Sequence, residues 1–412
     1  MAITAHADVA LRPRPEPSPD AKHETELIVK NGEVLTDQGL LPLDVAVTRG
    51  RIAALVQPAM ARSAGKTIDA AGFYVLPGFI DLHTHGGAGI DLMHATEDEI
   101  ARLTEFYAAQ GTTGFLATTL TAAKEETLSA LVRMKKVSER GTCGARMLGI
   151  HLEGPYITRD FAGAQPTAHI VPPTPQDFAA YDAAAGGLIR LVTLAPEVDG
   201  ALELISYLRQ RGVAVSLGHS GATYKCALAA IAAGACSCTH IFNGMKGLHH
   251  HEPGILGACL ESEIYSELIC DGRHLAPGTV RLLWKTKGID RLLAVTDSMV
   301  AAGLPDGTYW QGSLELTVRE GDVRLRDGSR AGSSLTMIGA LRNLIKFTGR
   351  GLAECVRPLT CNPAALLGIQ GAKGGIRQGM DADLVLIDRD YRVRGTIVDG
   401  RVVYAAGLEG VG

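Results

Sequence analysis

Eight short apolar runs, each followed by a stretch rich in Ala, Leu, Glu and Lys, dominate the middle of this chain. Continuous apolar runs that alternate with helix-like segments are typical of a parallel sheet buried on both faces. Eight of them indicate an α/β protein with a closed (β/α)₈ barrel of the TIM type, and an open doubly wound sheet is the alternative. GGAGID, after the first run, lacks the glycine spacing of a dinucleotide-binding fingerprint. The runs are residues 79–85, 114–120, 146–154, 189–196, 213–220, 236–243, 266–272 and 292–298.

The two ends of the chain have a different pattern, in which short strand-like runs are separated by Asn-Gly, Arg-Gly or Asp-Gly. Such pairs between alternating runs favour β-hairpins. We therefore expect one small β-sandwich domain built from residues 24–75 and 376–412, with the barrel domain over residues 76–375. Residues 1–23 contain RPRPEPSPDA, and this Pro-rich composition predicts a disordered extension.

Composition and charge exclude several classes of protein. With 46% hydrophobic and 20% charged residues the chain is typical of a folded globular protein. Forty Lys and Arg against 44 Asp and Glu leave no positive surplus for nucleic acid or an anionic membrane. The eight Cys lack disulfide-scaffold or zinc-ribbon spacing, so reduced thiols are expected. We find neither a signal-peptide pattern nor a membrane-spanning apolar run, and expect a cytoplasmic protein without a membrane partner.

Side chains able to bind a metal stand at the ends of five of the eight runs. Because all strands of a parallel barrel end on one face, residues distant in sequence converge there. His83 and His85 are two residues apart, and the strand period of two places both imidazoles on the same side. Any one of these histidines alone could be a buried structural residue, but the whole set at matched strand ends indicates a metal site. Its members are His83, His85, Glu153, His219, His240 and Asp297.

Mixed imidazole and carboxylate ligands suit one or two divalent cations. Glu153 could bind the ion held by His83 and His85, or bridge it to a second ion held by His219 and His240. We expect Zn²⁺, although Fe²⁺, Mn²⁺ and Co²⁺ accept the same ligands.

Asp297 is the last polar residue before the eighth loop. A carboxylate beside a metal ion and its water can take the proton from the water and return it to a leaving group. We therefore expect Asp297 to be the general base and then the general acid of a hydrolysis. The alternatives are that Asp297 is only a ligand, or caps a helix that begins at Ser298.

Seven motifs occur in a fixed order between residues 76 and 338: PGFIDLHTHG, HLEGPY, LGHS, THIFNGM, DGRH, VTDS and AGSSLTM. In this order, flanked by the divided β domain, the chain resembles the N-acetylglucosamine-6-phosphate deacetylases of the amidohydrolase superfamily. His-Leu-Glu-Gly-Pro, Gly-His-Ser and Thr-His-x-x-Asn together resemble this family rather than dihydroorotases or ureases. The carbamylated Lys that bridges two metals in several relatives has no counterpart, because the third run ends in Glu153.

The resemblance implies a homodimeric enzyme of amino-sugar catabolism that hydrolyses the acetamido group of N-acetyl-D-glucosamine 6-phosphate. The products would be D-glucosamine 6-phosphate and acetate. Glu153, His219 and His240 match the common metal ligands of the family, and Asp297 matches the catalytic acid/base. The family also implies a set of substrate-contacting positions, which are Gln165, Asn243, Gly244, His251, His274, Ala331 and Gly332.

Two positions depart from the family pattern. Gln165 replaces a His that polarises the acetamide carbonyl, and Gln can donate a hydrogen bond but carries no charge. His251 replaces an Arg that binds the sugar phosphate, and His is charged only when its pKa is raised. N-acetylgalactosamine 6-phosphate and an unphosphorylated N-acetylhexosamine are therefore the alternative substrates. A sugar-phosphate binder without catalysis is the alternative from another class, and the intact ligand set with Asp297 argues against it.

Overall fold

Eight parallel strands form the central sheet of the molecule. The computed structural model describes residues 25–58 and 65–408, so the extension predicted at residues 1–23 lies outside the described residues. Within the sheet the order is β15-β14-β13-β12-β11-β10-β9-β6, and a parallel bridge between Thr84 and Ser298 joins its two ends. Each of the eight apolar runs forms one strand, which confirms the predicted barrel. The strands are β6 (Phe79–Thr84), β9 (Thr112–Thr118), β10 (Arg146–Glu153), β11 (Ile189–Leu194), β12 (Ala214–Leu217), β13 (Ser237–Cys238), β14 (Tyr265–Ile269) and β15 (Leu292–Val295).

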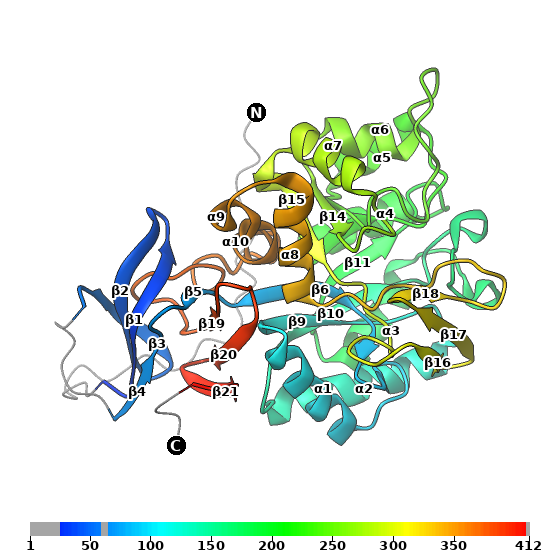
Figure 1. Ribbon diagram of the computed structural model, residues 1–412. Coiled ribbons are helices and arrows are strands. Elements are labelled where there is room, and N and C mark those ends of the chain that lie inside the picture. The colour runs from blue at the N-terminus through cyan, green and yellow to red at the C-terminus, as the bar shows by residue number, and fades with distance from the viewer. Residues whose placement is uncertain (1–24, 59–64, 409–412) are drawn as a thin grey trace.

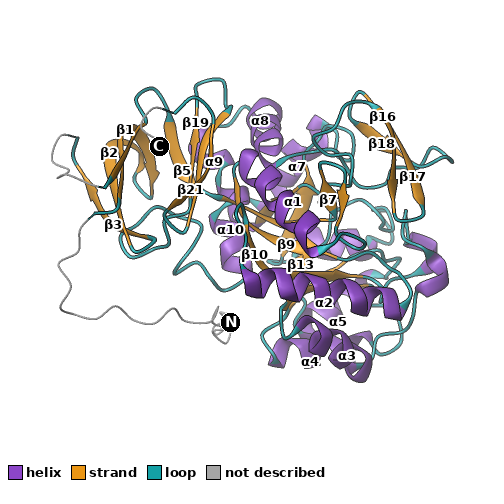
Figure 2. Cartoon of the chain, turned by 90° about the horizontal axis from the view of Figure 1, so that it is seen from below, coloured by secondary structure: helices purple, strands orange, loops and turns teal. Residues whose placement is uncertain are grey.

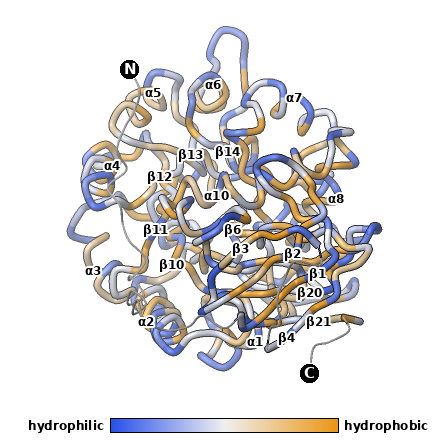
Figure 3. Tube along the Cα trace, turned by 90° about the vertical axis from the view of Figure 1, so that its left-hand side faces the viewer, coloured by the Kyte–Doolittle hydropathy of each residue, from blue (hydrophilic) through white to orange (hydrophobic). Residues whose placement is uncertain are grey.

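Helices surround this sheet in chain order, and Figure 3 shows them as a ring around the strands. Four of them begin directly after a Thr whose hydroxyl accepts a backbone N–H of the first turn: Thr96, Thr174, Thr223 and Thr336. The ring consists of α1 (Glu97–Ala109), α2 (Lys124–Arg140), α3 (Pro175–Ala185), α4 (Ala201–Gln210), α5 (Tyr224–Ala233), α6 (Gly254–Glu261), α7 (Pro277–Lys287) and α8 (Met337–Thr348). Two short helices, α9 (Leu352–Cys355) and α10 (Cys361–Leu366), follow it.

Strands from both ends of the chain form a second sheet beside the barrel, with blue and red segments side by side in Figure 1. Its order is β21-β20-β19-β5-β1-β2-β3, and the first part of β1 pairs in addition with β4. Antiparallel pairing of β5 with β19 joins the two ends, as predicted. The strands are β1 (Leu27–Thr36), β2 (Gly39–Thr48), β3 (Arg51–Val56), β4 (Lys66–Asp69), β5 (Tyr74–Pro77), β19 (Leu384–Ile387), β20 (Val393–Val398) and β21 (Arg401–Ala405).

Only Gly78 separates β5 of this second sheet from β6 of the barrel. A Cβ atom at Gly78 would lie 2.1 Å from Oγ1 of Thr113 in the neighbouring barrel strand β9, so a side chain at this position would clash with that strand. The close approach explains why the chain passes from one sheet to the other at a glycine.

A small antiparallel sheet follows the eighth barrel strand and was not anticipated from the sequence. It consists of β16 (Gly307–Gln311), β17 (Leu314–Arg319) and β18 (Asp322–Arg324), and it covers a buried cluster that includes Met299, Leu316 and Ala331. Figures 1 and 2 both place it on the side of the barrel away from the chain-end sheet. A two-residue pair, β7 (Gly86–Gly87) and β8 (Ile90–Asp91), follows the first barrel strand.

All eight cysteines are free thiols, as their spacing led us to expect. Among the described residues we find no helix with the length and apolar composition needed to cross a bilayer.

Candidate metal centre

The six residues predicted to bind metal or move a proton lie together where the barrel strands end. Glu153 is the last residue of β10, whereas His219, His240 and Asp297 each lie two residues beyond β12, β13 and β15. His83 is the second-last residue of β6, and His85 follows its end directly. All six are buried, and the most accessible of them, Asp297, is 7% exposed. The structure thus brings the whole predicted set into one buried polar cluster of side chains.

Three of these residues have backbone angles that are unusual for residues other than glycine. The φ angles are 48° at His219, 26° at His240 and 48° at Asp297. The left-handed region costs an L-residue free energy because its Cβ atom crowds the backbone, and such positions cluster at functional sites. Each of them lies two residues beyond the end of a barrel strand, where the backbone leaves the extended conformation.

One half of the cluster joins His83, His85 and Asp297 to Glu153. The Nε2 atom of His85 lies 3.3 Å from Oε2 of Glu153 and 3.2 Å from Oδ1 of Asp297. The Nε2 atom of His83 lies 3.2 Å from that of His85 and 3.4 Å from Oε1 of Glu153. Four potential ligand atoms therefore face one small volume.

The other half joins His219 and His240 to the same carboxylate. Their Nε2 atoms lie 3.2 and 3.1 Å from Oε1 of Glu153, and 3.1 Å from each other. Glu153 thus stands between two groups of imidazoles. Its position matches either a ligand of one ion or a bridge between two.

Two observations show that these side chains fit a divalent metal ion. Ligand atoms bound to one tetrahedral ion at about 2.1 Å are separated by about 3.4 Å, close to the separations within each half of the cluster. In addition, Nδ1 of His83, His219 and His240 each has an acceptor, which leaves Nε2 to face the shared volume. Histidines that bind metals are held in this way.

The electrostatics favour ionised carboxylates in the cluster. Burial acts to raise the pKa of Glu153, but His83, His219 and His240 outweigh it and hold this pKa well below its usual range. For Asp297 burial acts in the same direction, but His83 and His85 lower the pKa to about 2. Burial by itself would lower the pKa of His85, whereas hydrogen bonds to Asp297 and Glu153 raise it to about 9. A metal ion would compete with the protons on these imidazoles, so its binding releases protons.

The nitrogen and the oxygen of the Gln165 amide both form hydrogen bonds beside the six candidate residues. We call these six residues the metal cluster: His83, His85, Glu153, His219, His240 and Asp297. Its Nε2 atom donates to Oε2 of Glu153 over 2.7 Å, and its Oε1 atom accepts the backbone N–H of Thr121 over 2.6 Å. The residue is 5% exposed. These two bonds fix the orientation of the side-chain amide, with its nitrogen toward Glu153 and its oxygen toward Thr121.

Asn243 and Gly244 lie beside the second pair of imidazoles. The carbonyl of Asn243 accepts from Nδ1 of His240 over 3.2 Å. A Cβ atom at Gly244, whose φ is 59°, would lie 3.0 Å from Nδ1 of His219, which excludes larger residues. Both residues therefore help to set the positions of the histidines.

Other predicted substrate contacts lie at varying distance from the cluster. Ala331 is buried, and the chain after Gly332 contacts Asp297 directly, because Ser333 donates its N–H to the carbonyl of Asp297 over 2.7 Å. His274 is held by Asp271, whose Oδ2 atom lies 2.7 Å from the imidazole Nδ1.

The structure does not bring His251 to the metal cluster. Its side chain is exposed, and its ring packs 4.0 Å from that of His250. In the part of the chain that the structure describes, no hydrogen bond or ion pair links His251 to the cluster. His249 and His250 are exposed as well, as expected for a solvated loop.

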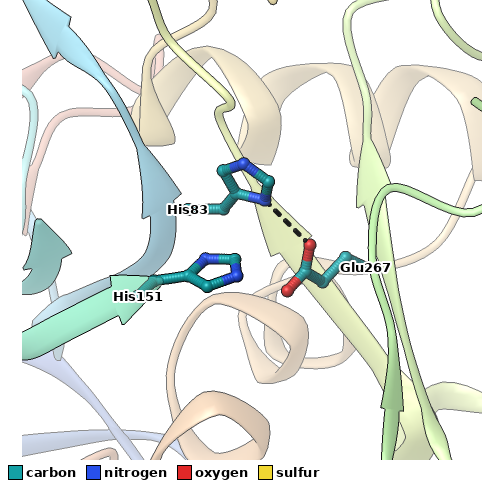
Figure 4. A group of neighbouring side chains, drawn as sticks. All are labelled: His83, His151 and Glu267. Atoms are coloured by element: carbon teal, nitrogen blue, oxygen red, sulfur yellow. Dashed lines mark hydrogen bonds and ion pairs between the residues drawn. The ribbon is translucent and has the colours of Figure 1, made fainter. Parts of the chain in front are cut away.

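Two buried polar residues of the barrel were missed by sequence reasoning. Glu267 lies within β14 and His151 within β10, and Figure 4 shows both beside His83. His151 precedes Glu153 by two residues, so the strand period that paired His83 with His85 could have found it. Glu267 is a charged residue inside its apolar run, between Ser266 and Leu268, and this was the available signal.

Comparison with known proteins extends over nearly the whole chain. Residues 74–403 match the Amidohydrolase family. An N-acetylglucosamine-6-phosphate deacetylase from Bacillus subtilis (strain 168) is 38% identical over 384 residues, which are 92% of this chain and 97% of the relative. An N-acetylgalactosamine-6-phosphate deacetylase from Escherichia coli O157:H7 is 38% identical over 327 residues, 79% of this chain and 86% of the relative.

A solved structure of similar fold contains a bound sugar phosphate. It is a mutant N-acetyl-D-glucosamine-6-phosphate deacetylase from Mycobacterium smegmatis in complex with N-acetyl-D-glucosamine-6-phosphate. The sequence identity is 34% and the TM-score 0.86, and the match covers 92% of this chain and 100% of the solved one.

Proposed function

Because the chain belongs to the amidohydrolase family, we propose that it hydrolyses the acetamido group of N-acetyl-D-glucosamine 6-phosphate to D-glucosamine 6-phosphate and acetate. The observation that carries this proposal is the grouping of four imidazoles and Asp297 around Glu153 at the ends of the barrel strands. The activity named for the Bacillus subtilis relative, over 97% of that protein's length, supports the same substrate. In this role the enzyme belongs to amino-sugar catabolism.

We propose that the cluster holds one or two divalent cations, and that each of them is Zn²⁺. His83 and His85 would hold one ion, His219 and His240 the other, and Glu153 would supply a carboxylate oxygen to either. A divalent cation bound there polarises the amide carbonyl and lowers the pKa of water. Imidazole nitrogen and carboxylate oxygen are ligands that Zn²⁺ accepts readily.

Asp297 moves the proton in the proposed reaction. Its pKa of about 2 keeps it ionised at neutral pH, so it can accept a proton as a water molecule attacks the carbonyl carbon. A C–O bond then forms, and the C–N bond breaks as the Asp297 carboxyl group returns this proton to the leaving nitrogen. The products are acetate and the amine, with no further reactant.

Gln165 orients the acetamide in this scheme. One hydrogen of its amide nitrogen is used by Glu153, and its oxygen is used by Thr121. The second hydrogen of the same nitrogen is left to donate to the substrate carbonyl. We assign contacts with the rest of the substrate to Asn243, Gly244, His251, His274, Ala331 and Gly332.

The proposal also includes a homodimer in the cytoplasm. The eight free thiols suit a reducing compartment. Light scattering of the purified protein tests the dimer, since a monomer would have the mass of a single 43.4 kDa chain.

The first test measures acetate release by the purified, metal-loaded protein from three substrates. N-acetylglucosamine 6-phosphate should be hydrolysed with a higher kcat/KM than unphosphorylated N-acetylglucosamine or N-acetylgalactosamine 6-phosphate. A preference for either of the other two would contradict the assigned substrate but retain the reaction. No acetate from any of them would contradict the reaction itself.

His251→Arg tests whether this exposed residue contacts the phosphate. Arg offers a permanent charge and two parallel hydrogen bonds, so KM for the phosphorylated sugar should fall about tenfold, the change expected for roughly 1.4 kcal/mol. His249→Arg adds the same charge to the same exposed loop and is the matched control. An equal fall of KM in both variants would show a general charge effect rather than a contact at His251.

A further inference from the structure

Glu267 is a fully buried carboxylate whose basic partner among the described residues is the imidazole of His83. Its side chain is 0% exposed, and among the described residues no Lys or Arg forms an ion pair with it. Its Oε1 atom has no hydrogen-bond partner at all. Removing such a group from water costs several kcal/mol unless nearby charge offsets it, so this residue requires a specific explanation.

All contacts of Glu267 through its Oε2 atom are with residues of the metal cluster. Oε2 lies 3.1 Å from Nδ1 of His83, as the dashed line in Figure 4 marks. It also accepts the backbone N–H of His240 over 3.2 Å. One carboxylate oxygen thus contacts one histidine from each half of the cluster.

His83, His151 and Glu267 could be read as a third metal site, because one potential ligand atom of each lies within 4.8 Å of the others. His151 argues against this interpretation. Its Nδ1 atom lies 3.1 Å from the carbonyl oxygen of Leu82, and its Nε2 atom lies 2.8 Å from Oγ1 of Thr193. Nδ1 therefore donates to the carbonyl and the lone pair on Nε2 accepts from the hydroxyl, so no lone pair is left for an ion.

We propose that Glu267 is a positioning residue, which holds His83 with Nε2 directed at the metal ion and fixes the backbone that carries His240. The inference rests on the proposed function, because Glu267 has this role only if His83 binds a metal. The carboxylate can only accept here, so the hydrogen of the imidazole stays on Nδ1 and the lone pair stays on Nε2.

The effect should be larger at the ion held by His83 than at the ion held by His219 and His240. The other two Nδ1 atoms donate to backbone carbonyls, of Phe161 and Asn243, whereas only His83 donates to a carboxylate. A carboxylate partner raises the basicity of a metal-binding imidazole, and its loss typically lowers metal affinity 10- to 100-fold. His240 contacts Glu267 only through its backbone.

The test measures Zn²⁺ affinity by competition with a chromophoric chelator, without any need for turnover. In Glu267→Leu the affinity at the His83 half should fall roughly 10- to 100-fold, with a smaller change at the other half. Glu267→Gln keeps an acceptor oxygen and the shape of the side chain, so its loss should be smaller. Glu263→Gln, an exposed glutamate just before β14, is the matched control and should bind as wild type.

The Zn²⁺ titration should have two phases, one for each half of the metal cluster. A His85→Ala background shows which phase belongs to which half. His85→Ala should remove the phase of the His83 half, and adding Glu267→Leu to it should then change the remaining phase little. Thermal unfolding of the metal-free proteins identifies any variant that does not fold, and Glu267→Gln then carries the test.

The inference would be overturned if both Glu267 variants bound Zn²⁺ as wild type, or if both phases weakened equally. A wild type that released acetate with Zn²⁺ bound only at His219 and His240 would also overturn it, while the proposed function stood. Absence of both Zn²⁺ binding and acetate release in the wild type would instead contradict the proposed function itself.

Discussion

Two regions of this molecule bury a cluster of carboxylates, and they lie at opposite ends of the barrel strands. The metal cluster occupies the ends of the strands, around Glu153. The other cluster consists of Asp381, Asp383 and Asp399, and it lies beside the starts of the strands, where the carbonyl of Asp383 accepts from Gly78 just before β6. In both, at least three potential ligand atoms lie within 4.8 Å of one another.

The two clusters differ in what neutralises them. The Nζ atom of Lys373 lies 2.5 Å from Asp383 and 2.9 Å from Asp381, and this Lys is buried. Burial acts to lower the pKa of Lys373, but the aspartates outweigh it and raise this pKa, so the group is charged. The metal cluster contains imidazoles, whose lone pairs bind cations, and no Lys or Arg pairs with it in the described residues. Close carboxylates therefore indicate a metal site only where the protein itself supplies no permanent cation.

The largest predicted loss of stability comes from a substitution in the aspartate cluster. Lys373→Met removes the buried cation that contacts Asp381 and Asp383, and the free energy of unfolding should fall by about 3–5 kcal/mol. Urea denaturation measures this loss, and kcat of the folded fraction should be unchanged. Lys285→Met alters an exposed lysine and should stay within about 0.5 kcal/mol of wild type. A Lys373→Met protein that bound Zn²⁺ at the aspartates with full stability would contradict the distinction.

Asp297→Asn is the corresponding change in the metal cluster. We expect kcat to fall by about 10²-fold or more, equivalent to about 2.7 kcal/mol, because an amide cannot accept and return the proton. Metal content and the urea midpoint should change little, in contrast to Lys373→Met. An Asn variant that kept full activity would exclude Asp297 from the proton-transfer role.

The smallest effect concerns an exposed ionic group. His94 contacts Asp91 over 2.5 Å and Glu126 over 2.7 Å, and the hydrogen bond to Asp91 raises its pKa although partial burial opposes this. A raised pKa contributes stability below the unfolded value of about 6.5, and the contribution disappears as the pH rises through the folded pKa.

His94→Gln should therefore cost less than about 1 kcal/mol at pH 6, because solvent screens the pair, and still less at pH 9. Urea denaturation of wild type and variant at both pH values checks this order. A larger cost at pH 9 would contradict the assigned direction of the pKa.

Sequence reasoning found the barrel and the six metal-cluster residues for the same reason. Each barrel strand is a continuous apolar run because both of its faces are buried, so a His or a carboxylate at its end stands out. Glu267 was overlooked because it lies inside a run rather than at its end. The sheet β16–β18 was overlooked because its short strands are only partly buried and interrupt no apolar run.

The aspartate cluster depends on contacts that no local pattern reveals. Lys373 lies ten residues before Asp383 in a segment without a strand pattern, and Asp399 reaches the same place from beyond β20, where its N–H donates to Asp383. The position of His251 likewise depends on the path of an exposed loop, on which sequence spacing places no constraint.

The left-handed backbone at His219, His240 and Asp297 affects which substitutions this sequence can accumulate during evolution. At these positions glycine would relieve a strain of about 1–3 kcal/mol that the present residues sustain. Selection for activity thus favours the present residues at these three positions, whereas selection for a stable fold favours glycine. A descendant freed from the need for catalysis would gain stability by losing these side chains, so glycine at all three positions would be the mark of an abandoned metal centre.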